Sequence, residues 1–230
     1  MQRVDYAQTN GIATIAMDDG KANAMSPAML AELNAALDRA EKEAAVVVLT
    51  GRSGLFSAGF DLGVLRAGGD PALGMLRGGF ELAERLLSFP IPTVAACGGH
   101  AIAMGAFLLL SCDVRIGSAG AHRLSANEVA IGLTMPLPAV AVLQYKLTPA
   151  AADRAIATAA DFRPDEALAA GFLDQVVPPD ALAAVCRETA TRLASLHRDA
   201  HHASKLRARV STLEALRAGV EADFPMASSA

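Results

Sequence analysis

The 230-residue sequence predicts an α/β fold, because short apolar strands alternate along it with amphipathic helices. Residues 12–17 and 45–49 have the near-continuous apolar character of buried strands. Between them, a Ser-Pro pair at 26–27 is typical of a helix start, and the apolar residues that follow recur every four positions. Two strands that flank one helix in this way form a β-α-β unit.

The alternation continues through the middle of the sequence. A Gly-rich loop precedes a helical stretch at 73–87, and a buried strand follows at 93–97. An apolar helix near 104–112 then leads to a short strand at 114–116. These elements extend the predicted α/β core.

The last part of the chain is predicted to be helical. Its sequence is rich in Ala, and the pairs Thr148-Pro149 and Arg163-Pro164 are helix starts. A last helical run extends over about 179–218. We therefore divide the chain into an α/β core at 1–177 and a C-terminal helical region at 178–230.

Composition excludes several classes of protein. Twenty basic and twenty-four acidic side chains give a net charge of -4 without a basic cluster, so we expect neither nucleic acid nor a membrane as a partner. The uncharged stretch 86–112 is interrupted by Pro and Gly and does not predict a membrane span. Cys97, Cys112 and Cys186 lie in apolar stretches and form no CxxC pair. With no export signal at the start of the sequence, we expect buried, reduced thiols and a cytoplasmic protein.

Common catalytic motifs are missing. The turn at 51–54 lacks the Lys-Ser/Thr of a phosphate-binding loop, no GxGxxG follows a strand, and Ser57 lacks the glycine that a nucleophile elbow requires. His197, His201 and His202 lack the Glu of a zinc-binding HEXXH, so we expect surface histidines and no metal site.

Two junctions between a strand and a helix are more informative. The segments 56–62 and 99–106 combine small residues with the start of a helix. Backbone N–H groups at such a junction, helped by the positive end of the helix dipole, stabilise a developing oxyanion. Either segment alone is more typical of a packing turn than of an oxyanion site.

Five ordered segments, however, resemble the enoyl-CoA hydratase/isomerase family, also called the crotonase superfamily. They are Asn-Ala-Met-Ser at 23–26, FSAGFDL at 56–62, GHAIAMGAFLLLSCD at 99–113, NEVAIGL at 127–133 and ALAAGFLDQVVP at 167–178. The resemblance covers roughly residues 10–210 and is closest in motif to the Δ3,Δ2-enoyl-CoA isomerases.

The resemblance implies a crotonase-like spiral of repeated ββα units. It implies C-terminal helices that assemble a homotrimer or a hexamer. It also implies an acyl-CoA thioester as the substrate, with no cofactor beyond the coenzyme A that the substrate carries.

The resemblance assigns the thioester oxygen to the backbone N–H groups of Phe60 and Met104. The Gly-Gly-Gly that relatives carry is here Ala103-Met104-Gly105, and we expect the Met side chain to narrow the pocket. The groove for the substrate is assigned to Lys21, Ala22, Ala24, Ala58, Gly59, Asp61, Leu62, Ala103, Phe107 and Asn127.

The acid and base residues decide which reaction is expected. Hydratases of this family use two glutamates, of which Glu128 matches the second, while Phe107 occupies the position of the first. A phenyl ring neither accepts a proton nor orients water. The resemblance therefore favours an isomerase that uses Glu128 as base and then acid. An enoyl-CoA hydratase with an atypical site and a non-catalytic acyl-CoA-binding protein are the alternatives.

Overall fold

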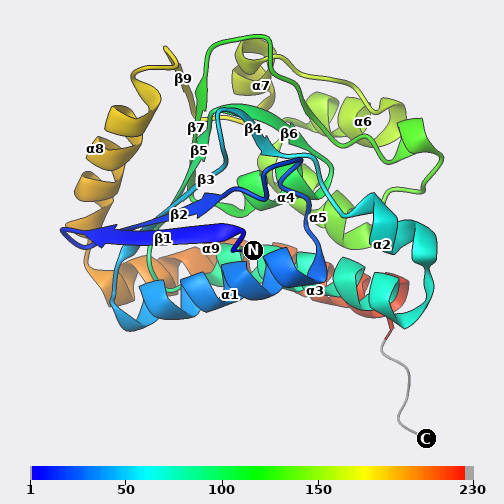
Figure 1. Cartoon of the computed structure of the whole chain (residues 1–230), viewed down its shortest axis with the longest axis horizontal. Helices are drawn as coiled ribbons and strands as arrows, with labels where there is room; N and C mark the ends of the chain where they lie inside the picture. Colours follow the sequence, from blue (N-terminus) through cyan, green and yellow to red (C-terminus); the bar gives the residue numbers. More distant parts are fainter. Residues whose placement is uncertain (1, 226–230) are drawn as a thin grey trace, which may run out of the picture.

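Two β-sheets form the centre of the computed structural model, which describes residues 2–225 (Figure 1). The large sheet has the strand order β1-β2-β3-β5-β7-β9, in which only the β1/β2 pair is antiparallel. Its strands are β1 (Val4–Thr9), β2 (Ile12–Met17), β3 (Val46–Thr50), β5 (Thr93–Cys97), β7 (Val114–Ser118) and β9 (Gln175–Val177). The small sheet is parallel and consists of β4 (Gly54–Ser57), β6 (Gly99–Ile102) and β8 (Leu124–Ser125).

Successive turns of the chain contribute one strand to each sheet. The pairs β3–β4, β5–β6 and β7–β8 each place their first strand in the large sheet and their second in the small one. Helices follow the second strand: α2 and α3 after β4, and α4 after β6. This is the expected spiral of ββα units, and the predicted fold class is confirmed.

Helices cover both faces of the large sheet. Because side chains alternate along a strand, β3 directs Val47 and Leu49 to one face and Val48 and Thr50 to the other. The first face packs on α1 and α3, and the second faces α8. The helices are α1 (Pro27–Lys42), α2 (Leu62–Ala67), α3 (Gly69–Ser88), α4 (Met104–Ser111), α5 (Leu137–Lys146), α6 (Pro149–Thr158), α7 (Pro164–Ala170), α8 (Leu182–Ala194) and α9 (Arg198–Asp223), with a 3-10 turn at Val129–Ile131.

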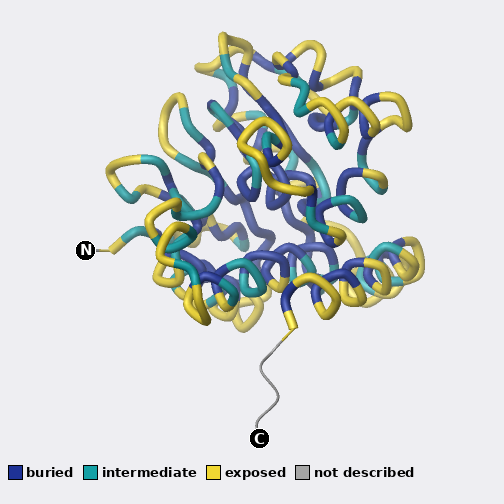
Figure 2. Tube along the Cα trace, turned by 90° about the vertical axis from the view of Figure 1, so that its right-hand side faces the viewer, coloured by how far each residue is buried: buried dark blue, intermediate teal, exposed yellow. Residues whose placement is uncertain are grey.

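The core lies between these layers. Figure 2 shows buried backbone through the centre of the molecule and exposed turns around its periphery. All eight residues of α4 are buried, which explains why its sequence is apolar on every side. This helix is therefore held from all sides, and its N-terminus is fixed in position.

The predicted helix starts at Pro27, Pro149 and Pro164 are confirmed, as are the strands at 12–17 and 93–97. The continuous helical run predicted over 179–218 is wrong. The chain leaves the helical path between α8 and α9, where the Nδ1 atom of His197 accepts a hydrogen bond from the Ala200 N–H at 3.4 Å and caps α9.

A buried ion-pair cluster ties α9 to the sheet. The Asp113 carboxylate lies 2.7 Å from Lys205 Nζ and 2.8 Å from an Arg209 Nη atom. Burial opposes ionisation of Asp113, but the two cations outweigh it and lower the pKa of the carboxyl. His201 Nε2 lies 3.9 Å from the same carboxylate, so the expectation that all three histidines of this segment lie at the surface is wrong for His201.

All three cysteines are free and buried, as expected. Within residues 2–225, no helix combines the length and the apolar character needed to cross a membrane. The end of the predicted C-terminal region, 226–230, lies outside the described residues.

Candidate active site

Three candidate reactive groups follow the three strands of the small sheet. Phe60 lies three residues after β4, Met104 two residues after β6, and Glu128 three residues after β8. Because the three strands are parallel and adjacent, their carboxyl ends meet at one edge of the sheet. Residues far apart in the sequence are therefore brought to one place.

The two predicted oxyanion donors are free to bind a ligand. Among residues 2–225, the N–H groups of Phe60 and Met104 donate no hydrogen bond to another part of the protein. The two junctions are also in contact. A Cβ built on Gly59 would lie 3.5 Å from the Met104 nitrogen, and the positive φ of Gly59, 95°, turns the chain toward Phe60.

The backbone conformation of Ala103 orients the N–H group of Met104. Ala103 has a φ of 49°, which costs a residue with a Cβ about 1–3 kcal/mol, and it immediately precedes α4. Its own N–H donates to the Ser125 carbonyl at 2.8 Å, which fixes the β6 and β8 strand ends to each other. Met104 is the first residue of α4, so its N–H lies at the positive end of the helix dipole.

The predicted substrate loop at 21–24 is attached to the first junction. The Ala58 N–H donates to the Ala22 carbonyl at 3.0 Å, and Ser57 Oγ donates to the Asn23 carbonyl at 2.7 Å. Asn23 is fully buried, and its amide donates to the carbonyls of Met17 and Phe56 at 2.9 and 3.1 Å. The loop therefore lies directly beside the β4 strand end.

Asp19 shapes the same loop from within. Its carboxylate accepts from the N–H groups of Lys21 and Asn23 at 2.8 Å and of Ala24 at 3.0 Å. Burial opposes ionisation, but these hydrogen bonds outweigh it and lower the pKa of Asp19. The Arg52 guanidinium donates to the Lys21 carbonyl, so two exposed cations flank the loop. Sequence reasoning missed Asp19, Asn23 and Arg52 as loop-shaping residues, although an Asp before a Gly is a recognisable turn signal.

Phe107 belongs to an aromatic cluster in the core. Its ring is fully buried and stacks on Phe80 with a centroid distance of 5.8 Å. Phe80 also packs against Phe60 at 6.2 Å and Phe224 at 5.7 Å. Residue 107, where the resemblance to hydratases predicts a glutamate, is therefore part of an apolar wall.

The Met104 side chain is directed toward α3. It is fully buried, and its sulfur lies 3.3 Å from the place that a Cβ on Gly79 would occupy. The same Cβ would collide with the Phe60 ring at 2.5 Å, so Gly79 makes room for both side chains. The thioether thus packs between α3 and α4.

Glu128 is a buried carboxyl at the edge of the sheet. Its residue exposure is 7%, and its Oε2 atom has no hydrogen-bond partner among the described residues. Burial raises the pKa of Glu128 to about 7. At neutral pH, the group is therefore poised both to accept and to release a proton.

The remaining predicted groove residues lie at the same strand ends. The Asp61 side chain caps α2, with Oδ1 accepting from Gly63 and Val64 N–H at 2.8 and 3.3 Å. Leu62 is exposed, whereas Asn127 is partly buried beside Glu128. The part of the chain that the structure describes contains no cluster of three or more His, Cys, Asp or Glu side chains suited to a metal ion.

This arrangement supplies what an enolate-forming reaction needs. Two free N–H groups are available for a thioester oxygen, and a carboxyl with a raised pKa follows the neighbouring strand. A fold of ββα turns with such a site defines a class of proteins that can bind the oxygen of a carbonyl group beside a proton-accepting carboxyl.

Comparisons with known proteins agree with this class. The enoyl-CoA hydratase/isomerase family model matches residues 7–230, and the chain belongs to that family. A crystal structure of a probable enoyl-CoA hydratase from Mycobacterium tuberculosis is 48% identical with a TM-score of 0.93, over 96% of this chain and 94% of that one. Human mitochondrial Δ3-Δ2-enoyl-CoA isomerase is 30% identical with a TM-score of 0.91, over 97% and 89%.

A putative enoyl-CoA hydratase from Thermus thermophilus is 37% identical over 70% of this chain and 66% of its own length. Relatives called hydratases and relatives called isomerases both occur, and the shared fold does not separate the two reactions.

Proposed function

We propose that the protein is a Δ3,Δ2-enoyl-CoA isomerase that uses Glu128 as its single acid/base group. The observation that carries the proposal is the contrast between two positions. Glu128 is a buried carboxyl whose pKa is raised to about 7, and Phe107, where hydratases of the family have their first glutamate, is a fully buried ring. A proton shuttle needs one carboxyl, whereas the activation of water in hydratases of the family needs two.

The reaction proceeds in two proton transfers. The N–H groups of Phe60 and Met104 bind the thioester oxygen of a 3-enoyl-CoA, which makes the C2 proton acidic. The Glu128 carboxylate removes that proton, and the electron pair of the C2–H bond forms a dienolate whose negative charge rests on the bound oxygen. The protonated Glu128 then returns the proton to C4, and the double bond moves from C3–C4 to C2–C3.

The loop at 21–24 is proposed to receive the coenzyme A portion of the substrate. Lys21 and Arg52 are exposed cations at this loop, which suits phosphate groups. Ala58, whose N–H donates to the Ala22 carbonyl, and Gly59 connect this loop to the proposed oxyanion donors. The reaction requires no cofactor, since coenzyme A is part of the substrate.

We also propose a homotrimer or hexamer in the cytoplasm. Val129, Ile131, Leu133 and Leu137 are exposed apolar side chains in one segment after Glu128, which supports an interface between copies of the chain. Light scattering after gel filtration measures the molar mass of the protein in solution. The mass of a monomer would contradict the proposed homotrimer or hexamer. Three free, buried thiols support a reducing compartment.

The function is tested with two substrates. Purified protein is incubated separately with a trans-3-enoyl-CoA and a trans-2-enoyl-CoA, and isomer and 3-hydroxyacyl products are separated by chromatography. Isomerisation of the first without hydration of the second is expected. Hydration of the second would favour the hydratase alternative, which the names of several relatives suggest.

Two variants test the role of Glu128. Glu128→Gln keeps the shape of the side chain and removes its basicity, so turnover is expected to fall by about 10² to 10⁴. Glu188→Gln changes an exposed glutamate on α8 and serves as the control. Equal rates for Glu128→Gln and the unmodified protein would exclude Glu128 as the base, and binding of acyl-CoA without any turnover would favour the non-catalytic alternative.

A further inference from the structure

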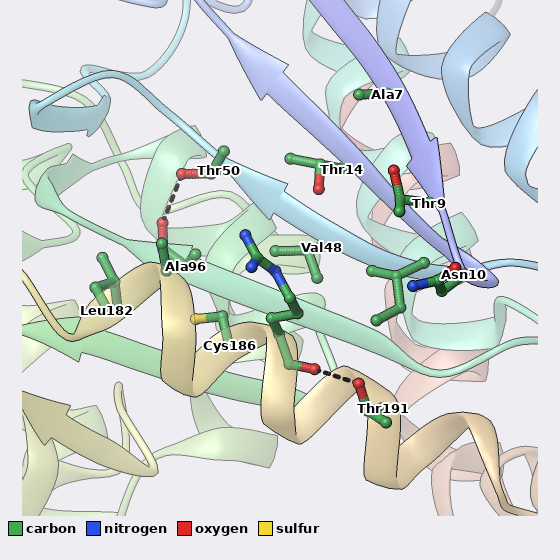
Figure 3. Close-up of a pocket in the computed structure, with 13 residues that line it drawn as sticks. Ala7, Thr9, Asn10, Thr14, Val48, Thr50, Ala96, Leu182, Cys186 and Thr191 are labelled. Atoms are coloured by element: carbon green, nitrogen blue, oxygen red, sulfur yellow. Dashed lines mark hydrogen bonds between the residues drawn. The ribbon is translucent and has the colours of Figure 1, made fainter.

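A cavity lies on the face of the large sheet that is opposite α1 and α3. It has a volume of about 620 Å³ and lies between β1, β2, β3, β5 and α8 (Figure 3). None of the residues placed at the active site lines it. Its lining residues are Ala7, Thr9, Asn10, Ile12, Thr14, Val48, Thr50, Ala96, Leu182, Ala183, Cys186, Arg187 and Thr191.

The floor of this α8 groove is apolar with hydroxyl groups set into it. Figure 3 shows Ala96 and Leu182 at one end and Thr9 and Asn10 at the other. Thr50 Oγ1 donates to the Ala96 carbonyl at 3.2 Å and is already engaged. The hydroxyls of Thr9 and Thr14 have no protein partner among residues 2–225 and are available to a ligand.

One charge lies at the groove. Arg187 lines it from α8, and its guanidinium forms no ion pair within the described residues. No acidic residue lines the cavity. The groove therefore presents an uncompensated positive charge beside an apolar floor.

We propose that the α8 groove is a second binding site, for an anionic amphiphile of the medium-chain carboxylate class. The volume lies within the range of about 300–1000 Å³ that is usual for small-molecule sites. A small inorganic anion would engage Arg187 and leave the apolar floor uncovered. A carboxylate with an aliphatic chain places its head on Arg187 and the threonine hydroxyls, and its chain on Val48, Ile12 and Leu182.

Calorimetric titration of the full chain with decanoate tests the site. Arg187→Gln removes the charge, and binding is expected to weaken about tenfold or more because a charge-assisted contact is lost. Arg192→Gln removes an exposed charge from α8 outside the groove and is expected to bind like the unmodified protein. Decan-1-ol, which has the same chain without the charge, is expected to bind at least tenfold more weakly than decanoate.

A matched pair of tryptophan variants locates the site. Ala183→Trp fills the groove and is expected to abolish decanoate binding there, while Ala184→Trp, one residue further along α8, leaves it intact. The chain contains no other tryptophan, so emission from each variant also reports whether its indole is buried. Decanoate binding that is unchanged in both Arg187→Gln and Ala183→Trp would place the ligand elsewhere and overturn the proposal, as would the absence of binding to the unmodified protein.

Discussion

The backbone of Gly59 approaches Ala103 so closely that a Cβ at residue 59 would lie 2.9 Å from the Ala103 Cβ. The Ile102 carbonyl oxygen would lie 3.1 Å from the same position. This contact sets the separation of the β4 and β6 strand ends, and with it the separation of the N–H groups of Phe60 and Met104.

Gly59→Ala is therefore expected to impair both activity and folding. The added methyl group pushes the strand ends apart, and the positive φ of residue 59 adds strain. We expect kcat/KM to fall by about 10² or more, because losing one oxyanion donor has an effect of that size. Gly74→Ala on α3, where the added methyl group meets open space, is the control and should retain activity. Normal turnover by Gly59→Ala would show that activity does not depend on the separation of the β4 and β6 strand ends.

Glu128 is expected to make stability depend on pH. Below its ordinary pKa of 4.5, this carboxyl is protonated in both the folded and the unfolded chain. Between pH 4.5 and 7, the unfolded chain ionises while the folded chain resists, so its contribution to the free energy of unfolding is lost as the pH rises. Glu128→Gln should then be more stable than the unmodified protein at pH 8 by about 3 kcal/mol, and the gain should vanish near pH 4.

Urea unfolding of both proteins at the two pH values measures this difference, with Glu188→Gln as the exposed control. If Glu128→Gln raised the free energy of unfolding equally at pH 4 and pH 8, the gain would come from packing and not from the ionisation of Glu128. In the free enzyme, kcat/KM should rise with pH through an apparent pKa near 7, since only the carboxylate removes the C2 proton.

Phe107 is expected to tolerate an apolar replacement and not a carboxylate. Phe107→Leu keeps most of the buried volume, so it should lower the free energy of unfolding by about 1–2 kcal/mol and leave isomerisation intact. Phe107→Glu places an ionisable group against Phe80 and should lower stability by several kcal/mol more. Thermal unfolding and product analysis measure both effects. A stable Phe107→Glu protein that hydrates a trans-2-enoyl-CoA would contradict this account of the aromatic wall.

The Asp113 cluster is expected to anchor α9. Asp113→Ala leaves Lys205 and Arg209 buried without their carboxylate, which should cost about 3–5 kcal/mol of stability. Glu214→Ala removes an exposed carboxylate from the same helix and should be nearly neutral. Urea unfolding measures the two changes, and equal stabilities would mean that packing alone holds α9.

Local sequence patterns predicted the large sheet better than the small one. The apolar strands at 12–17 and 93–97 agree with β2 and β5 because each is long enough for its burial to be recognised. Local sequence patterns indicate only turns and junctions for the segments that form β4 and β6. They are only four residues long, contain Gly, and are ordered by pairing with strands distant in the sequence.

The resemblance to the family located the site. The burial of Glu128 and the hydrogen bonds of the loop at 21–24 could be obtained only from the structure. The order of the motifs placed Phe60, Met104 and Glu128 at one site, but the sequence gives no measure of burial at residue 128, where the next residue, Val129, is exposed. The hydrogen bonds by which Asn23 ties the substrate loop to β4 join residues 33 and 34 positions apart. Such contacts depend on tertiary packing and leave no local signal.

Each of the three reactive positions is carried by a different turn of the spiral, on a strand end whose neighbours are fixed by the rest of the sheet. Altering one turn therefore also affects its neighbours, because Gly59 contacts Ala103 and the Ala103 N–H donates to the Ser125 carbonyl. We therefore expect a disruptive substitution at Phe107 also to affect the N–H group of Met104, because both residues belong to α4.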